Sequence, residues 1–138
     1  MRTLEPGDQE AVVAAGPLFD RPPDAEATRR FLSEPTHHLL MAYDSAGAPV
    51  GFVSGVETSH PDKGTEMFLY ELSVDAAARR RGVGRRLVEA LTELARGIGC
   101  YGLWVLADDD SAPARATYAR AGGREASRPV MIEWEFGS

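Results

Sequence analysis

The sequence predicts a mixed α/β fold of the α+β type, with a sheet built around three consecutive strands. Strand-like runs with short turns between them fill the chain from His38 to Val74, and such a succession favours an antiparallel meander. An amphipathic helix then runs from Gly82 to about Arg96, with its apolar side chains three or four residues apart. A further apolar run, Tyr101 to Ala107, follows this helix, which is typical of a crossover connection between two strands.

Two short helices are expected before the meander. Residues 1–4 are predicted to form a short strand, which a Pro-Gly pair ends. Asp8 to about Phe19 is predicted as a helix that ends or kinks just before Pro17, because proline cannot continue a helix. Asp24 can cap a second helix, which stops before Pro35.

The meander itself has three predicted strands: His38 to Tyr43, Pro49 to Glu57 and Glu66 to Val74. Gly51 and Gly55 in the second strand indicate a bend or a bulge. In the third strand, regular alternation places side chains on two faces. One face would carry Phe68, Tyr70, Leu72 and Val74, and the other Met67, Leu69, Glu71 and Ser73.

A last helix and two short strands are expected to close the chain. Ser111 followed by Pro113 predicts a helix start, and Gly122-Gly123 predicts its end. Short strands are expected near residues 124–127 and 130–136. The predicted order is β-α-α-β-β-β-α-β-α-β-β, in a single domain that spans residues 1–138.

Composition restricts the partners. A net charge of −6 and a pI near 5.0 argue against nucleic acid. The negative net charge can attract a cationic substrate, although such a charge more commonly serves only to keep a protein soluble. The single cysteine, Cys100, excludes an internal disulfide and fits a reducing compartment. No apolar run reaches transmembrane length and no signal-peptide pattern is present, so a cytoplasmic protein without membrane contact is expected.

The turn before the long helix is the clearest functional motif. Arg79-Arg80-Arg81-Gly82-Val83-Gly84 follows a strand that ends at Leu72-Ser73-Val74. Such a turn leaves peptide N–H groups unpaired at a helix N-terminus, and its glycines let a phosphate approach the backbone. The motif therefore predicts a binding site for a pyrophosphate-bearing cofactor, against the alternative of a solvated glycine-rich connection.

Two side chains stand out as candidates for chemistry. Glu71 is a carboxylate inside an otherwise apolar strand, so it is either functional or faces solvent. Tyr118 lies seven residues after Ser111, on the same helix face, where it is either a core aromatic beside Ala121 or a phenol that donates a proton.

Other polar groups carry weaker signals. Asp108, Asp109 and Asp110 either form an acidic rim for a polycation or a solvated turn that caps the following helix. Glu133 and Glu135 alternate with apolar residues, so they line a cleft or face water. The three histidines lack metal-ligand spacing, and no metal site is predicted.

The signature Arg79 to Gly84, with its strand, its helix and the tyrosine of the next helix, resembles the GNAT superfamily of N-acetyltransferases. Within it the chain is most similar to the small gentamicin (aminoglycoside) 3-N-acetyltransferases, on Phe68 to Val74, Ala107-Asp108 and Thr117-Tyr118. The resemblance implies a GNAT fold, with a twisted, mostly antiparallel sheet of about six to seven strands flanked by about four helices.

The resemblance also implies the roles of individual residues. Tyr118 would protonate the leaving thiolate, and Glu71 would act as base or ammonium ligand. The acceptor would be held by Glu71, Asp108, Asp109, Asp110, Glu133 and Glu135. Acetyl-CoA (coenzyme A) would be bound by Leu72, Ser73, Val74, Arg79, Arg80, Arg81, Gly82, Val83, Gly84 and Arg85.

The function that the resemblance implies is acetyl-CoA-dependent acetylation of a primary amine on a cationic acceptor. Transfer would be direct, in a ternary complex, and an aminoglycoside antibiotic acetylated at its 3-N position is the leading acceptor. Acceptors of other classes also fit: a polyamine, a small metabolite amine or a protein N-terminus. A non-catalytic acyl-CoA-binding domain is the alternative of a different class. The resemblance is compatible with a homodimer.

Overall fold

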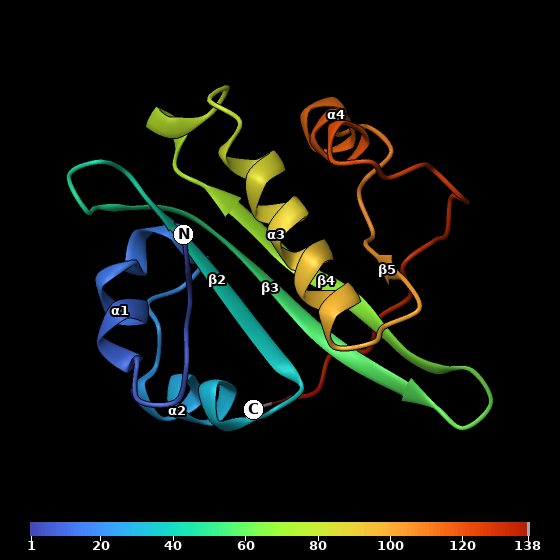
Figure 1. Ribbon diagram of the computed structural model, residues 1–138, viewed down its shortest axis with the longest axis horizontal. Coiled ribbons are helices and arrows are strands. Elements are labelled where there is room, and N and C mark those ends of the chain that lie inside the picture. The colour runs from blue at the N-terminus through green and yellow to red at the C-terminus, as the bar shows by residue number, and fades with distance from the viewer. Residues whose placement is uncertain (138) are drawn as a thin grey trace.

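The computed structural model describes residues 1–137 and contains one sheet with helices on both faces (Figure 1). The sheet has five strands in the order β1-β2-β3-β4-β5. The elements are β1 (Arg2–Thr3), α1 (Gln9–Ala14), η1 (Gly16–Leu18), α2 (Ala25–Ser33), β2 (His37–Tyr43), β3 (Pro49–His60), β4 (Gly64–Val74), η2 (Ala76–Ala78), α3 (Val83–Gly97), β5 (Leu103–Trp104) and α4 (Ala112–Arg120).

The predicted meander and crossover are confirmed. Strands β2, β3 and β4 pair antiparallel in sequence order, and β5 pairs parallel to β4 after the crossover helix α3. Alternate residues of β2 point to opposite faces of the sheet, so the chain has two cores. Leu40 and Val53 pack under α3, whereas Leu39 and Phe52 pack against α1 and α2.

Strand β4 contains a bulge at Tyr70. Ser54 of β3 pairs with Glu71, but the next residue, Gly55, pairs with Leu69, so Tyr70 has no partner in the register. An extra residue on one strand reverses the side-chain alternation beyond it. The expected regular alternation is therefore wrong. Side chains on the α3 side are Met67, Leu69, Leu72 and Val74, while Tyr70, Glu71 and Ser73 lie on the α1/α2 side.

The bulge coincides with the point where β4 and β5 separate. Their pairing consists of Met67 with Leu103 and Phe68 with Trp104, and it ends there. Figure 1 shows the chain after β5 diverging from β4 toward α4. The expected strand from Tyr101 to Ala107 is thus only two residues long.

The two C-terminal strands expected near residues 124–127 and 130–136 are absent, so the sheet has five strands and not six or seven. A strand needs a neighbouring edge to pair with, and β5 offers only two residues. The apolar side chains of the segment are exposed. They are Val130, Met131, Ile132, Trp134 and Phe136.

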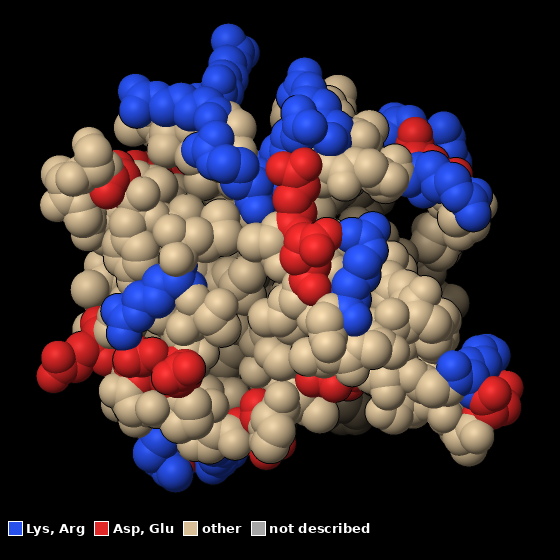
Figure 2. Space-filling view, viewed as in Figure 1, with Lys and Arg blue, Asp and Glu red and all other residues tan. Residues whose placement is uncertain are grey.

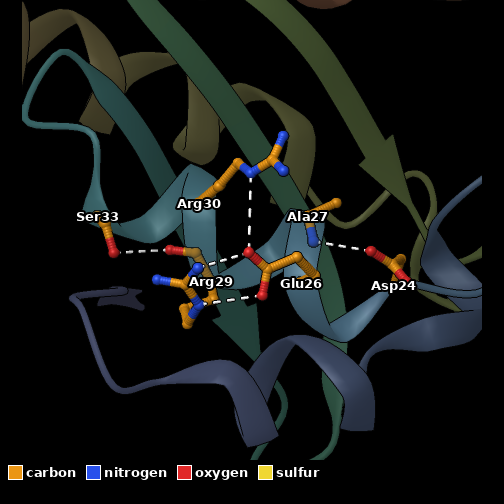
Figure 3. Close-up of polar contacts among 6 residues, drawn as sticks. All are labelled: Asp24, Glu26, Ala27, Arg29, Arg30 and Ser33. Atoms are coloured by element: carbon orange, nitrogen blue, oxygen red, sulfur yellow. Dashed lines mark hydrogen bonds and ion pairs between the residues drawn. The ribbon is translucent and has the colours of Figure 1, made fainter.

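Most predicted helices match the structure closely. The first predicted helix ends at Ala14 as α1, and the short helix η1, which contains Pro17, follows it. The break expected before Pro17 is therefore present. Asp24 caps α2, since its Oδ2 accepts the N–H of Ala27 at 2.8 Å (Figure 3). No helix within residues 1–137 is both long enough and apolar enough to cross a membrane.

Candidate active site

The separation of β4 and β5 leaves one edge of β4 without a strand partner. From Leu69 to Val74 this strand pairs only with β3 on its other side. Its peptide groups on the β5 side are available to a ligand, because an unpaired strand edge presents N–H donors and C=O acceptors in a row. This free edge contains Leu72, Ser73 and Val74, which are among the residues expected to bind acetyl-CoA.

The turn of Arg79 to Gly84 lies directly beyond this edge. Arg80 and Gly82 have positive φ angles of 66° and 77°, and Gly82 is the N-cap of α3. Arg79 Nε donates to the carbonyl of Val74 at 3.3 Å, which ties the turn to the end of β4. Figure 2 shows basic side chains gathered along the upper edge of the molecule, over the turn that joins β4 to α3.

This turn has the properties of an anion site. Arg86 is the first residue of α3 whose peptide N–H forms the regular helical hydrogen bond, and it donates to the carbonyl of Gly82. The N–H groups of the preceding first turn, from Val83 to Arg85, have no hydrogen-bond acceptor within residues 1–137. Because these donors sit at the positive end of a 15-residue helix beside arginine side chains, they fit a pyrophosphate.

Close packing brings α4 to the same opening. A Cβ on Gly84 would lie 3.3 Å from Thr117 Cγ2 and 3.6 Å from Val74 Cγ2, so glycine allows α3, α4 and β4 to meet. The next residue, Tyr118, is half-buried against the core under α3, and burial raises the pKa of its phenol. Within residues 1–137, its hydroxyl has no hydrogen-bond partner.

Glu71 lies on the opposite face of β4, next to the free edge. Its peptide N–H donates to Ser54 Oγ at 3.2 Å. Burial raises the pKa of the Glu71 carboxyl, and the nearby carboxylate of Asp20 raises it further. In the described part of the chain the Glu71 carboxylate has neither a hydrogen-bond donor nor an ion-pair partner. A half-buried carboxylate in this condition is suited to accept a proton or an ammonium group.

A cavity of about 280 Å³ opens at Glu71, between α2 and the sheet. Its wall is mainly apolar and comes from α1, the loop after it, α2 and strands β2 to β4. The lining residues are Val12, Phe19, Pro23, Asp24, Ala27, Thr28, Phe31, Leu39, Phe52, Ser54, Val56, Tyr70 and Glu71. We call this cavity the acceptor pocket.

The other acidic candidates lie elsewhere. Asp108, Asp109 and Asp110 are exposed at the start of α4, and none lines the acceptor pocket. The carbonyl of Asp109 accepts from Arg115 Nη1 at 2.8 Å, which is a local structural contact. Glu133 and Glu135 are exposed in the C-terminal segment, also outside the pocket.

Two of the histidines have local partners. His38 Nε2 lies 2.7 Å from Glu57 Oε2, and His60 Nε2 lies 3.0 Å from Glu66 Oε1. No group of three or more His, Cys, Asp or Glu side chains within residues 1–137 is arranged to hold a metal ion.

The aromatic residues of the pocket were missed by sequence reasoning. Phe19, Phe31 and Tyr70 come from three different elements and are ordinary core candidates in the sequence. The only local signal was Gly55, which predicted an irregularity in β3 opposite the bulge.

Comparison with known proteins identifies the family. The model of the Acetyltransferase (GNAT) family matches residues 8–123, so the chain belongs to this family. GNAT acetyltransferases use acetyl-CoA, and the free β4 edge and the turn before α3 fit that cofactor. The family that the signature Arg79 to Gly84 predicted is thereby confirmed.

Individual relatives differ in the acceptor that their names state. Mycothiol acetyltransferase of Mycobacterium avium is 33% identical over 126 residues, which are 88% of this chain and 39% of that protein. The chain thus spans about two fifths of this relative. The fold is also similar to that of an aminoglycoside acetyltransferase from an uncultured soil metagenomic sample, solved in complex with sisomicin. The TM-score is 0.89 at 18% sequence identity, and the match covers 99% of this chain and 95% of the other. A second metagenomic aminoglycoside acetyltransferase is 28% identical, with a TM-score of 0.79 and 97% of both chains covered.

Proposed function

We propose that this chain transfers the acetyl group of acetyl-CoA directly to a primary amine whose nitrogen is held at Glu71. The observation that carries the proposal is an unpartnered, half-buried carboxylate beside the free edge of β4, with the basic N-terminus of α3 at the end of the same strand. The ammonium ligand, the free strand edge and the anion site thus follow one another along β4 and the turn after it.

The residues at this opening would divide the binding of acetyl-CoA between them. The backbone of Leu72, Ser73 and Val74 would pair with the amides of the pantetheine arm. The N–H groups from Arg80 to Arg85 and the arginine side chains would bind the pyrophosphate. When bound, acetyl-CoA supplies a thioester carbonyl as the electrophile.

Glu71 and Tyr118 would manage the protons. Glu71 holds the ammonium group and accepts one of its protons, so that the neutral nitrogen attacks the thioester carbonyl carbon. The C–N bond forms, the C–S bond breaks, and the sulfur leaves with the bonding electron pair. Tyr118 donates its phenolic proton to this thiolate, a role suited to a phenol whose pKa is raised and which therefore stays protonated. The acylated nitrogen then releases its second proton, solvent returns a proton to the Tyr118 phenolate, and the products are the acetamide and coenzyme A.

An aminoglycoside is the acceptor that the resemblance implies, with acetylation at 3-N. Two metagenomic aminoglycoside acetyltransferases with this fold support that choice. The local charge also supports a cation, because Asp20, Asp24 and Glu71 place three carboxylates in and beside the acceptor pocket. Asp108 to Asp110, Glu133 and Glu135 would then act only through long-range attraction, since they lie outside the pocket.

The cytoplasmic location and the homodimer that were expected from the sequence remain predictions.

Thiol release from acetyl-CoA tests the proposal, with gentamicin, kanamycin and spermidine as separate acceptors. Turnover with any primary amine that is lost in Glu71→Gln supports it. Saturable acetyl-CoA binding without turnover on any amine would favour the alternative of a non-catalytic acyl-CoA-binding domain.

A further inference from the structure

We propose that the acceptor is a monoamine whose nitrogen lies on a short arm attached to an aromatic or branched aliphatic body. This assignment rests on the proposed function, because it takes Glu71 as the ammonium ligand, and it names the class of the acceptor. It differs from the polycation that the resemblance implies, and the reasons lie in the wall of the acceptor pocket.

Aromatic rings from four different segments line the pocket. Phe19 stacks on Phe52 with ring centroids 4.3 Å apart and an angle of 18° between the planes. Phe31 adds a ring from α2, and the bulge turns Tyr70 into the same cavity as Glu71. Apolar rings gain most from burial against other rings, whereas a hydroxylated sugar ring gains less.

Polar side chains at the pocket are few, and two of them already form hydrogen bonds within the protein. The Asp24 carboxylate accepts the N–H of Ala27 at the start of α2, as Figure 3 shows. The Ser54 hydroxyl accepts the N–H of Glu71. A sugar with several hydroxyl and ammonium groups would need a partner for each of them, and groups left unpaired on burial lose affinity. Glu71 is the one pocket carboxylate in the described chain that has no partner.

Charges around the pocket also favour a single ammonium group. On α2, Glu26 pairs with both Arg29 and Arg30, so this helix has no free carboxylate and carries a net positive charge (Figure 3). The neighbouring hollow of about 470 Å³ contains Asp20, but Arg21 lines it as well. A second ammonium group placed in that hollow would meet the guanidinium group.

The size of the pocket agrees with one ring. A dry protein cavity of roughly 150 Å³ accepts one benzene molecule. The acceptor pocket, at about 280 Å³, therefore has room for one ring and a two- or three-carbon arm that reaches Glu71. 2-Phenylethylamine has these features and is the probe for the test.

The test compares acceptors by thiol release from acetyl-CoA. We expect kcat/KM for 2-phenylethylamine to exceed that for kanamycin and for spermidine by about tenfold or more. Equal or better turnover of either polycation would overturn the assigned class while leaving the proposed function intact.

Two substitutions of Tyr70 sharpen the test. Tyr70 is 63% exposed, so its replacement should not unfold the chain. Tyr70→Ala should raise KM for 2-phenylethylamine about tenfold and leave KM for acetyl-CoA unchanged, and Tyr70→Glu should shift preference toward spermidine. Tyr101→Ala is the matched control, because Tyr101 is 54% exposed on the connection between α3 and β5. Unchanged KM in Tyr70→Ala would overturn the assignment.

A binding measurement separates the two proposals if no amine is acetylated. Saturation-transfer NMR reports contact between 2-phenylethylamine and the protein without turnover. Saturable binding that Tyr70→Ala weakens, in the absence of turnover, would support the ligand class and refute the proposed function. Absence of saturable binding would overturn the ligand class.

Discussion

Replacing Glu71 by glutamine keeps the size of the side chain and removes the charge that would hold an ammonium group. The pKa of Glu71 is raised above its ordinary value of 4.5, mainly by burial and then by Asp20. The folded chain therefore resists ionisation of this group more than the unfolded chain does. Above the folded pKa, the ionised carboxylate lowers the free energy of unfolding, and below about pH 4.5 it has no effect, since both states are protonated.

Glu71→Gln is thus expected to stabilise the fold at pH 8 and to be neutral near pH 4. Because the carboxyl is only partly buried, the gain should be small, on the order of 1 kcal/mol or less. The same substitution should impair catalysis. Loss of the charge partner in a partly desolvated pocket costs about 2–3 kcal/mol, which is about a 30- to 150-fold fall in kcat/KM.

The assay is thiol release between pH 6 and 9 together with thermal unfolding followed by circular dichroism at pH 4 and pH 8. Glu93→Gln is the control, because Glu93 pairs with Arg96 on the exposed surface of α3 and should change neither quantity appreciably. Wild-type kcat/KM in Glu71→Gln, or a lower melting temperature at pH 8, would refute the role assigned to this carboxylate.

Three further predictions concern the opening and the core. Tyr118→Phe should lower kcat about 100-fold without changing the circular dichroism spectrum, because the leaving thiolate loses its proton donor; pH-resolved kinetics measures this. Gly82→Ala should weaken coenzyme A binding, which isothermal titration calorimetry measures. An alanine held at the φ of 77° that Gly82 adopts should cost about 1–2 kcal/mol in backbone strain. Gly55→Ala should lower the free energy of unfolding in urea by about 1–3 kcal/mol, because its Cβ would lie 2.9 Å from Met67 Sδ and 3.0 Å from Leu91 Cδ1, both in the core.

Matched variants make these predictions specific. Tyr101→Phe removes a hydroxyl that donates to Glu66 at 3.0 Å and should leave kcat unchanged. Gly47→Ala carries comparable backbone strain, at φ 85° in the turn between β2 and β3, and should leave coenzyme A binding intact. Full turnover of Tyr118→Phe at every pH, unaltered binding in Gly82→Ala or a stable Gly55→Ala would each contradict the corresponding reasoning.

Features that depend on near neighbours in the chain were predictable from the sequence. The Asp24 cap, the break at Pro17, the amphipathic helix α3 and the turn before it all agree with the structure. Each depends on residues within one or two helical turns, so its signal lies within a short window of the sequence. The membership of the GNAT family followed from that same turn, and the family match agrees.

Features that depend on strand pairing were decided only by the tertiary structure. Gly55 predicted an irregularity, but the extra residue is Tyr70 on the partner strand, and it reverses which side of β4 faces α3. The alternating segment from 130 to 136 has a strand-like pattern without a strand partner, since β5 is only two residues long. A residue's face is set by the register with its neighbour, and that register is not written in the strand's own sequence.

The acceptor pocket shows the same division. By itself, the sequence determined that a carboxylate interrupts the apolar strand at Glu71, and it predicted a phosphate-binding turn after that strand. Only the tertiary structure brought Phe19 and Phe31 beside that carboxylate and left Asp108 to Asp110 outside the pocket. The physical reason is that a pocket is built by packing between elements far apart in the chain, whereas a cap or a turn is built by adjacent residues.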